Sequence, residues 1–210
     1  MFHVFLTGFI LTFGGFPGPQ SSLDISADTT ETRWALVSQE SEARYRVQEQ
    51  LAGFDLPNDA VGATRNVTGT ISFAPDGSLV PGGSEIRVQL SSLTTDNERR
   101  DGYVRRRTLE VEEYPEAVLV PLRFVDLPDP IPLSGSATFL LEADLSLHGE
   151  TRQTIWEVTA DFGPETLTGF ATTAFPFHTF GIAVPQVARV LSVENTIRLE
   201  LDFQFRKEAG

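Results

Sequence analysis

Apolar and polar residues alternate along most of the chain from residue 33 onward. The clearest example is NTIRLELDFQF at residues 195–205, where every second residue is Ile, Leu or Phe and the residues between them are charged or polar. Successive side chains of a β-strand point to opposite faces of a sheet, so this period of two predicts strands with one buried face. The chain therefore belongs to the all-β class.

Nine segments fit a strand pattern and are separated in many places by turn-forming Pro, Gly, Asp and Asn residues. They cover residues 34–37, 44–51, 67–73, 85–90, 117–125, 138–149, 154–162, 166–175 and 195–205. Each is apolar on one face only, which favours antiparallel pairing over a parallel sheet buried on both faces. We expect about eight of these strands to close into an antiparallel barrel. A β-sandwich is the alternative, because the pattern alone does not separate the two.

One segment between the strands has helical features. Thr95 and Glu98 have the spacing of a capping box, in which each side chain bonds the backbone at the start of a helix. Asp101 and Arg105 follow four residues apart, with the acid first, as in a stabilising helical ion pair. We predict one short helix that ends near Leu109.

Composition excludes several classes of function. The chain has 210 residues and a net charge of −13, which repels nucleic acid. It contains no Cys, so disulfides, thiolate nucleophiles and Cys-based metal sites are absent. The stretch NERRDGYVRRR holds five Arg, but residues 94–116 hold seven acidic residues around them. We therefore expect no nucleic-acid partner, and no metal, because the three His residues lack the spacing of a metal site.

The first 30 residues are set apart from the predicted barrel, which spans residues 31–210. An apolar run of about 15 residues opens the chain, shorter than the roughly 20 residues of a membrane-spanning helix. It has the length of the apolar part of a signal peptide, but no Lys or Arg precedes it. An export signal, a membrane tether and a misassigned start are the alternatives. Export to the periplasm or the cell exterior, with or without tethering, is the expected localisation.

Candidates for catalysis are few. No G-x-S-x-G pattern is present. His148 stands beside Gly149 at a predicted strand end, and His178 stands among aromatic residues with no identifiable acidic partner. A structural role is the simpler interpretation of both, and a His-dependent hydrolase remains an alternative function.

The apolar strand faces are either a packed core or the wall of a ligand cavity, and the residues alone leave both open. The small residues Ala143, Ala160, Gly69 and Gly169 fall among large ones on the predicted inner face. Small side chains leave room inside a barrel, which is the argument for a cavity.

Three stretches resemble a known family, the YceI-like lipid/polyisoprenoid-binding proteins. In NERRDGYVRRRTLEVEEYP the resemblance is carried by Asn97, Arg100, Asp101, Arg105, Tyr114 and Pro115. ADLSLHGETRQTIWEV and HTFGI (residues 178–182) resemble two later family stretches, and the likeness spans about residues 43–205. The family usually has His in place of Tyr103 and Asp-Phe in place of Thr108 and Leu109, so the chain resembles a divergent subgroup.

The resemblance implies a lipocalin-like eight-stranded barrel whose elongated apolar lumen holds an isoprenoid chain, such as a polyprenyl phosphate or a quinone tail. It brings no catalytic residues, no cofactor and no metal, and a homodimer is a possible assembly. The expected function is thus non-enzymatic binding of an isoprenoid lipid. The alternative is an exported structural or stress-related module with a filled barrel. The candidate lumen residues are Val88, Leu90, Val120, Leu122, Phe139, Leu141, Leu145, Trp156, Val158, Phe170, Leu199, Leu201 and Phe203.

Two arginines of the helical segment, Arg100 and Arg105, are the candidates for contact with a lipid head group. A guanidinium matches the geometry of a phosphate, so either could meet a lipid phosphate at the mouth of the lumen. The simpler interpretation is that they pair with the neighbouring acidic residues.

Overall fold

A computed structural model describes residues 31–53, 55–128, 131–187 and 190–209. The predicted export or tethering segment, residues 1–30, lies outside the described residues. In the part that is described, no helix is long and apolar enough to cross a membrane.

Eleven strands and one α-helix make up the described chain. The strands are β1 (Thr32–Leu36), β2 (Glu42–Leu51), β3 (Asn58–Thr64), β4 (Val67–Phe73), β5 (Glu85–Gln89), β6 (Glu116–Val125), β7 (Gly135–Leu147), β8 (Glu150–Phe162), β9 (Thr166–Phe175), β10 (Val190–Val193) and β11 (Ile197–Lys207). The helix α1 (Glu98–Tyr103) continues into the π-helical turn η3 (Val104–Thr108). Three 3₁₀ turns complete the set: η1 (Ser38–Glu40), η2 (Leu90–Ser92) and η4 (Phe177–Phe180).

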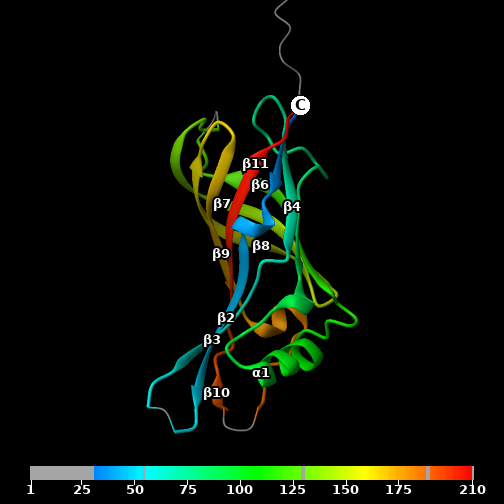
Figure 1. Ribbon diagram of the computed structural model, residues 1–210, viewed down its shortest axis with the longest axis vertical. Helices are drawn as coiled ribbons and strands as arrows, with labels where there is room; N and C mark the ends of the chain where they lie inside the picture. The colour runs from blue at the N-terminus through cyan, green and yellow to red at the C-terminus, as the bar shows by residue number, and fades with distance from the viewer. Residues whose placement is uncertain (1–30, 54, 129–130, 188–189, 210) are drawn as a thin grey trace, which may run out of the picture.

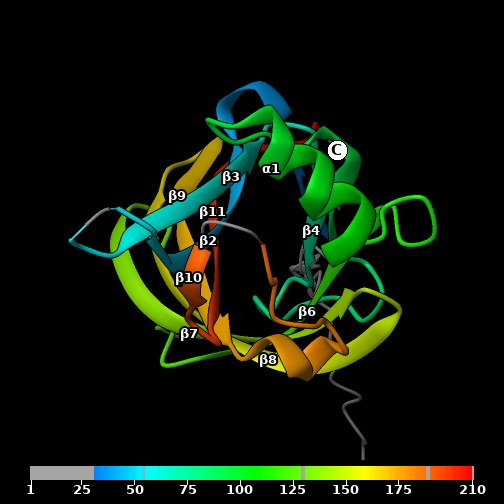
Figure 2. The ribbon, with the colours of Figure 1, turned by 90° about the horizontal axis from the view of Figure 1, so that it is seen from below.

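The strands close into an antiparallel barrel (Figure 1). The order is β1-β4-β5-β6-β7-β8-β9-β11, and β11 pairs back to β1. Seen from below, the strands form a ring with α1 at its rim (Figure 2). The predicted eight-stranded barrel with one short helix is therefore confirmed, and the sandwich alternative is excluded.

Two strands are not predicted by the sequence pattern. β3 and β10 both pair with β2 and extend the barrel wall at the end where α1 lies (Figure 1). β3 reads NDAVGAT and has few bulky residues to mark it. Its Gly62 lies under the ring of Tyr45, which a Cβ would approach to 2.2 Å. The small residue is thus explained by a large neighbour on the paired strand.

The start of the helix differs from the prediction. Asn97, not Thr95, caps it, because the Asn97 side-chain oxygen accepts hydrogen bonds from the backbone N–H groups of Arg99 and Arg100. Asp101 accepts hydrogen bonds from the backbone N–H and the hydroxyl of Thr95, at 2.8 and 2.6 Å. The predicted pair of Asp101 with Arg105 does not form, since Asp101 is already engaged at the entry to the helix.

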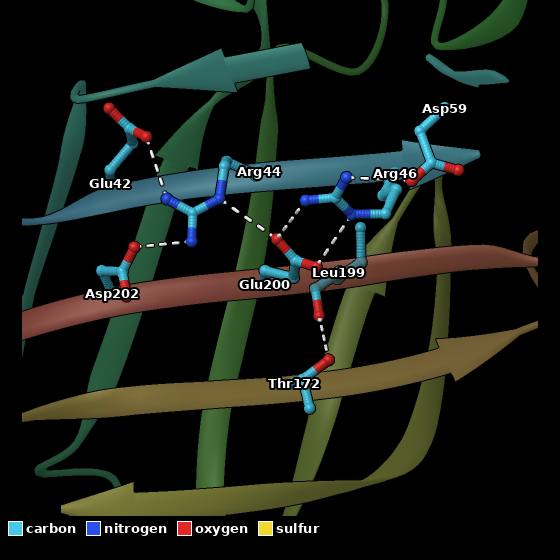
Figure 3. Close-up of polar contacts among 8 residues, drawn as sticks. All are labelled: Glu42, Arg44, Arg46, Asp59, Thr172, Leu199, Glu200 and Asp202. Atoms are coloured by element: carbon cyan, nitrogen blue, oxygen red, sulfur yellow. Dashed lines mark hydrogen bonds and ion pairs between the residues drawn. The ribbon is translucent and has the colours of Figure 1, made fainter. Parts of the chain in front are cut away.

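A network of ion pairs joins β2 to β11 on the outside of the barrel (Figure 3). Glu200 of β11, only 8 % exposed, lies between Arg44 and Arg46 of β2, with an oxygen 3.1 Å from the Nε atom of each. Three further carboxylates complete the network: Glu42 and Asp202 beside Arg44, and Asp59 beside Arg46. Burial raises the pKa of Glu200, but the hydrogen bonds and charges of Arg46 and Arg44 outweigh it and hold the pKa below its usual value.

Replacement of Glu200 by Gln should lower the free energy of unfolding at pH 7 by about 1–3 kcal/mol, because two half-buried arginines lose their shared carboxylate. The folded-state pKa is depressed, so this stability is present above the unfolded value of 4.5 and is lost as pH falls through the folded value. Urea unfolding at pH 7 and pH 3 should show a smaller difference from wild type at pH 3 than at pH 7. Glu157→Gln on the exposed face of β8 is the control, and an equal loss in both variants would contradict the assignment.

Candidate ligand-binding cavity

The interior of the described barrel is divided along its axis. The half next to α1 contains a cavity of about 530 Å³, whereas the opposite half contains a space of only about 50 Å³. Three side chains line both spaces and mark the boundary: Ile86 of β5, Leu119 of β6 and Leu201 of β11. The larger cavity is thus open toward α1 and closed halfway down the barrel.

The wall of the larger cavity is mainly aliphatic and comes from almost every element around it. Its apolar members include Ala43, Val47, Leu51, Ala60, Val88, Leu90, Leu93, Val104, Leu109, Ala117, Leu145, Leu147, Trp156, Phe177, Ile182, Ile197 and Leu199. Trp156 donates its indole N–H to the Thr154 hydroxyl at 2.9 Å, so its polar atom is satisfied and the ring presents an apolar surface. Such a wall suits an apolar ligand.

Six phenylalanines line the opposite half, and five of them make ring contacts that fill it. Phe124 stacks on Phe73 with ring centroids 6.1 Å apart and meets the edge of Phe139 at 5.3 Å. Phe203 and Phe205 lie 5.6 Å apart on β11. All five border the 50 Å³ space, which is about the size of a packing defect. The elongated lumen that the family resemblance implied is therefore open over one half only.

The small residues of the inner face make room for these rings and not for a ligand. A Cβ at Gly169 would come within 2.6 Å of the Phe203 ring and 2.3 Å of the Thr159 carbonyl oxygen. A Cβ at Gly69 would come within 2.6 Å of the Glu85 carbonyl oxygen on β5. The argument that small residues indicate a cavity is therefore wrong at these positions.

The structure distributes the thirteen predicted lumen residues over three regions. Six line the larger cavity: Val88, Leu90, Leu145, Trp156, Leu199 and Leu201. Four others line the filled half: Phe139, Leu141, Val158 and Phe203. The remaining three, Val120, Leu122 and Phe170, line neither.

Strand register explains two of the three errors. In β6 the buried residues are Leu119 and Pro121, so Val120 between them points outward. The register then shifts between Pro121 and Arg123, which leaves Leu122 41 % exposed. Because β6 is apolar on both faces here, its sequence does not show which face is buried.

Phe170 is the third error. It pairs with Thr159 of β8 and Asp202 of β11, and Thr159 is exposed while Asp202 joins the outer ion-pair network. Residues paired across antiparallel strands point to the same side of the sheet, so Phe170 lies on the outer face. Its neighbour Gly169 points inward.

Of the two head-group candidates, Arg100 lines the larger cavity and Arg105 does not. Arg100 is already compensated, because its guanidinium lies 2.7 Å from a Glu49 oxygen and 2.5 Å from an Asp96 oxygen. Arg105 donates a hydrogen bond to the Leu93 carbonyl at 3.0 Å. The interpretation that both arginines pair with neighbouring acidic residues therefore fits Arg100 with Asp96 and does not fit Arg105, whose partner is a backbone carbonyl.

Sequence reasoning missed a third arginine at the cavity. Arg99 is exposed, lines the cavity and has no carboxylate within ion-pair distance in the described part of the chain. The sequence separates it from Arg100 only through Asp96, which stands four positions before Arg100, and the second partner of Arg100, Glu49, is about fifty positions away.

Two buried hydroxyls at the cavity have no hydrogen-bond partner among the described residues, those of Tyr45 on β2 and Thr108 on η3. Burial raises the pKa of Tyr45 to about 12 despite the opposing charge of Arg100. A buried hydroxyl without a partner carries a desolvation cost, and such groups are rare in native proteins.

The residues of the family-like stretches gather beside the cavity. The rings of Tyr114 and His148 lie 4.8 Å apart, and a Cβ at Gly149 would come within 2.8 Å of the Tyr114 ring. Gly149 also has a φ of +76°, which favours glycine. The ring nitrogens of His148 lie 3.2 Å from the Phe180 carbonyl oxygen and 3.1 Å from a Glu110 oxygen. His148 thus connects three segments around the rim of the barrel.

The second candidate histidine, His178, is exposed on η4. The described residues contain no group of three or more His, Asp or Glu side chains arranged to hold a metal ion.

An antiparallel eight-stranded barrel with a closed-ended apolar cavity is the architecture of barrels that enclose one small ligand. The chain matches the model of the YceI-like domain over residues 34–205, and it belongs to this family. The family resemblance seen in the sequence is therefore confirmed. No curated protein matches the chain.

Solved structures share the fold at low sequence identity. A polyisoprenoid binding domain from Saccharophagus degradans, implicated in plant cell wall breakdown, is 11 % identical with a TM-score of 0.65, over 83 % of this chain and 98 % of that one. BcnA of Burkholderia cenocepacia is 14 % identical with a TM-score of 0.60, over 80 % and 98 %. The YCEI protein of Campylobacter jejuni is 13 % identical with a TM-score of 0.56, over 77 % and 91 %. At these identities the likeness establishes the fold.

Replacement of Tyr45 by Phe should raise the free energy of unfolding of the ligand-free protein by up to about 1 kcal/mol, because it removes a buried hydroxyl that has no partner. Urea unfolding of protein stripped of lipid measures this. Tyr114→Phe is the control, since the Tyr114 hydroxyl donates to Glu113 at 2.8 Å and its loss should bring no gain. A larger loss for Tyr45→Phe than for Tyr114→Phe would show that the Tyr45 hydroxyl is bonded in the free protein.

Proposed function

We propose that this protein is a non-enzymatic binder of an isoprenoid-type lipid, which it holds in the cavity beside α1. The observation that carries the proposal is the cavity itself: about 530 Å³, closed at one end and walled mainly by aliphatic side chains. Its volume lies in the range of sites that enclose small ligands. The likeness to a protein described as a polyisoprenoid binding domain supports the isoprenoid class.

Burial of the isoprenoid chain against this apolar wall supplies the binding affinity. Each buried methylene contributes about 0.8 kcal/mol before the cost of ordering the chain. The polar residues of the wall include Asn97, Arg99 and Arg100, which stand on or next to α1. We therefore place the polar end of the ligand at the α1 end and its chain toward Leu201.

The alternative functions find less support. A barrel that only binds partners on its outer face does not need an internal cavity, whereas this barrel has one of about 530 Å³ beside α1. A His-dependent hydrolase would need a base poised over a substrate. His148 instead has both ring nitrogens engaged by Phe180 and Glu110, and His178 is exposed without an acidic partner in the described chain.

Export is part of the same proposal. It rests on the apolar run at the start of the sequence and on the family resemblance. Fractionation of cells that make the full chain tests it, because a protein that stays in the cytoplasm at full length would contradict it.

Replacement of Val88 by Asp should reduce uptake of geranylgeraniol at least tenfold, because an ionised carboxylate would face the buried chain. Val120→Asp is the matched control: Val120 is also a half-buried valine, on the adjacent strand β6, but it faces outward. Ligand retained after gel filtration, measured by mass spectrometry, gives the uptake. Circular dichroism confirms that both variants are folded, and equal uptake by the two would contradict binding in this cavity.

Arg99 and Arg100 should respond differently to a phosphate on the ligand. Arg99→Gln should lower the affinity for geranylgeranyl phosphate relative to geranylgeraniol severalfold at low salt, because no carboxylate of the described residues compensates Arg99. Arg100→Gln should leave this ratio unchanged, because Glu49 and Asp96 already engage its guanidinium. Competition with a fluorescent prenol measures both affinities. A ratio that falls only in Arg100→Gln would show that Arg100 is the head-group residue.

A further inference from the structure

We infer that the barrel limits the length of the bound chain to about four isoprene units, and that Ile86, Leu119 and Leu201 form the floor that sets this limit. The inference rests on the proposed function and names the ligands within its class. It follows from the division of the barrel interior into an open half of about 530 Å³ and a filled half.

The cavity volume sets the number of carbon atoms. An apolar protein cavity of roughly 150 Å³ holds one benzene, or about 25 Å³ per carbon. On this scale a cavity of about 530 Å³ holds about 20 carbons, which is four isoprene units. A chain of eight units would need about twice that volume.

The floor is formed by neighbouring strands and rests on a packed layer. Ile86 and Leu119 are directly paired between β5 and β6, and Leu201 of β11 completes the boundary. Each of the three is at most 6 % exposed. Behind them stand Phe124, Phe139 and the other rings of the filled half, with about 50 Å³ between them. Interiors packed in this way do not open for a ligand without losing many contacts.

A longer chain would therefore leave its excess carbons outside the cavity. Each methylene that moves from a bilayer into water lowers the equilibrium constant for transfer to the protein by a factor of about four. A bilayer accommodates every carbon of a chain, whereas the cavity accommodates about 20. In competition with vesicles, chains of two to four units should transfer to the protein about equally well, and longer chains should transfer progressively less.

The experiment offers the protein prenols of two, three, four and eight units in neutral phosphatidylcholine vesicles. After flotation of the vesicles, mass spectrometry quantifies the prenol that stays with the protein. The bound fraction should be similar up to four units and more than tenfold lower at eight. Absence of every prenol would overturn the proposed function, whereas equal retention of all four would overturn only the length limit.

Two variants move the floor in opposite directions. Ala117→Phe adds six carbons beside Leu119, inside the cavity, and should lower the limit by about one unit. Leu119→Ala combined with Phe139→Ala joins the two spaces and should raise retention of the eight-unit prenol severalfold.

Phe175→Ala is the control for the enlarging variant, because Phe175 is as buried as Phe139, at 7 % exposure, but lines neither space. It should leave the length profile unchanged. If the double variant does not fold, Ala117→Phe alone tests the length limit, because its added ring fills existing space. An unchanged limit in folded Ala117→Phe protein would overturn the inference.

Discussion

Close packing of five phenylalanine rings in one half of the barrel is the constraint on which the other features of the molecule depend. An eight-stranded barrel has an interior that side chains can just fill, so the choice between core and cavity is made by the residues at each level along the axis. Gly169 on the adjacent strand β9 is paired with Phe203 and leaves space for its ring. One half is thereby a core, and the other half is free to be a site.

This division separates stability from binding within one domain. The filled half and the outer ion pairs around Glu200 hold β11 against its neighbours. The half beside α1 instead carries features that cost stability: a large cavity and the hydroxyls of Tyr45 and Thr108, which have no hydrogen-bond partner within the described ranges. A folded chain tolerates such costs where a ligand offsets them, and the stable half lets the empty site persist.

Alternation in the sequence predicts antiparallel strands, and the family resemblance favours a barrel over a sandwich. Alternation fails where a strand is apolar on both faces. Val120 and Leu122 of β6 are predicted to face the lumen but do not line it. Only the pairing partners and the shifted register of β6 show which of its faces is inside. Alternation also does not distinguish core residues from cavity residues among those that point inward. Phe139 belongs to the core and Leu145 to the cavity. Whether an inward residue lies in the core or in the cavity depends on which side chains meet across the barrel, and the sequence of a single strand does not show this.

The segment that carries the family resemblance shows the same division at the level of single residues. Asn97 caps α1 and Asp101 ties its entry to Thr95, so these matching positions build the rim of the site. The positions that depart from the family pattern, Tyr103, Thr108 and Leu109, all line the cavity. The departures thus change part of the cavity wall. The matching residues Asn97 and Arg100 also line the cavity, so the wall combines matching and changed positions. This is the arrangement expected when one fold serves different ligands, because function resides in the site and not in the fold.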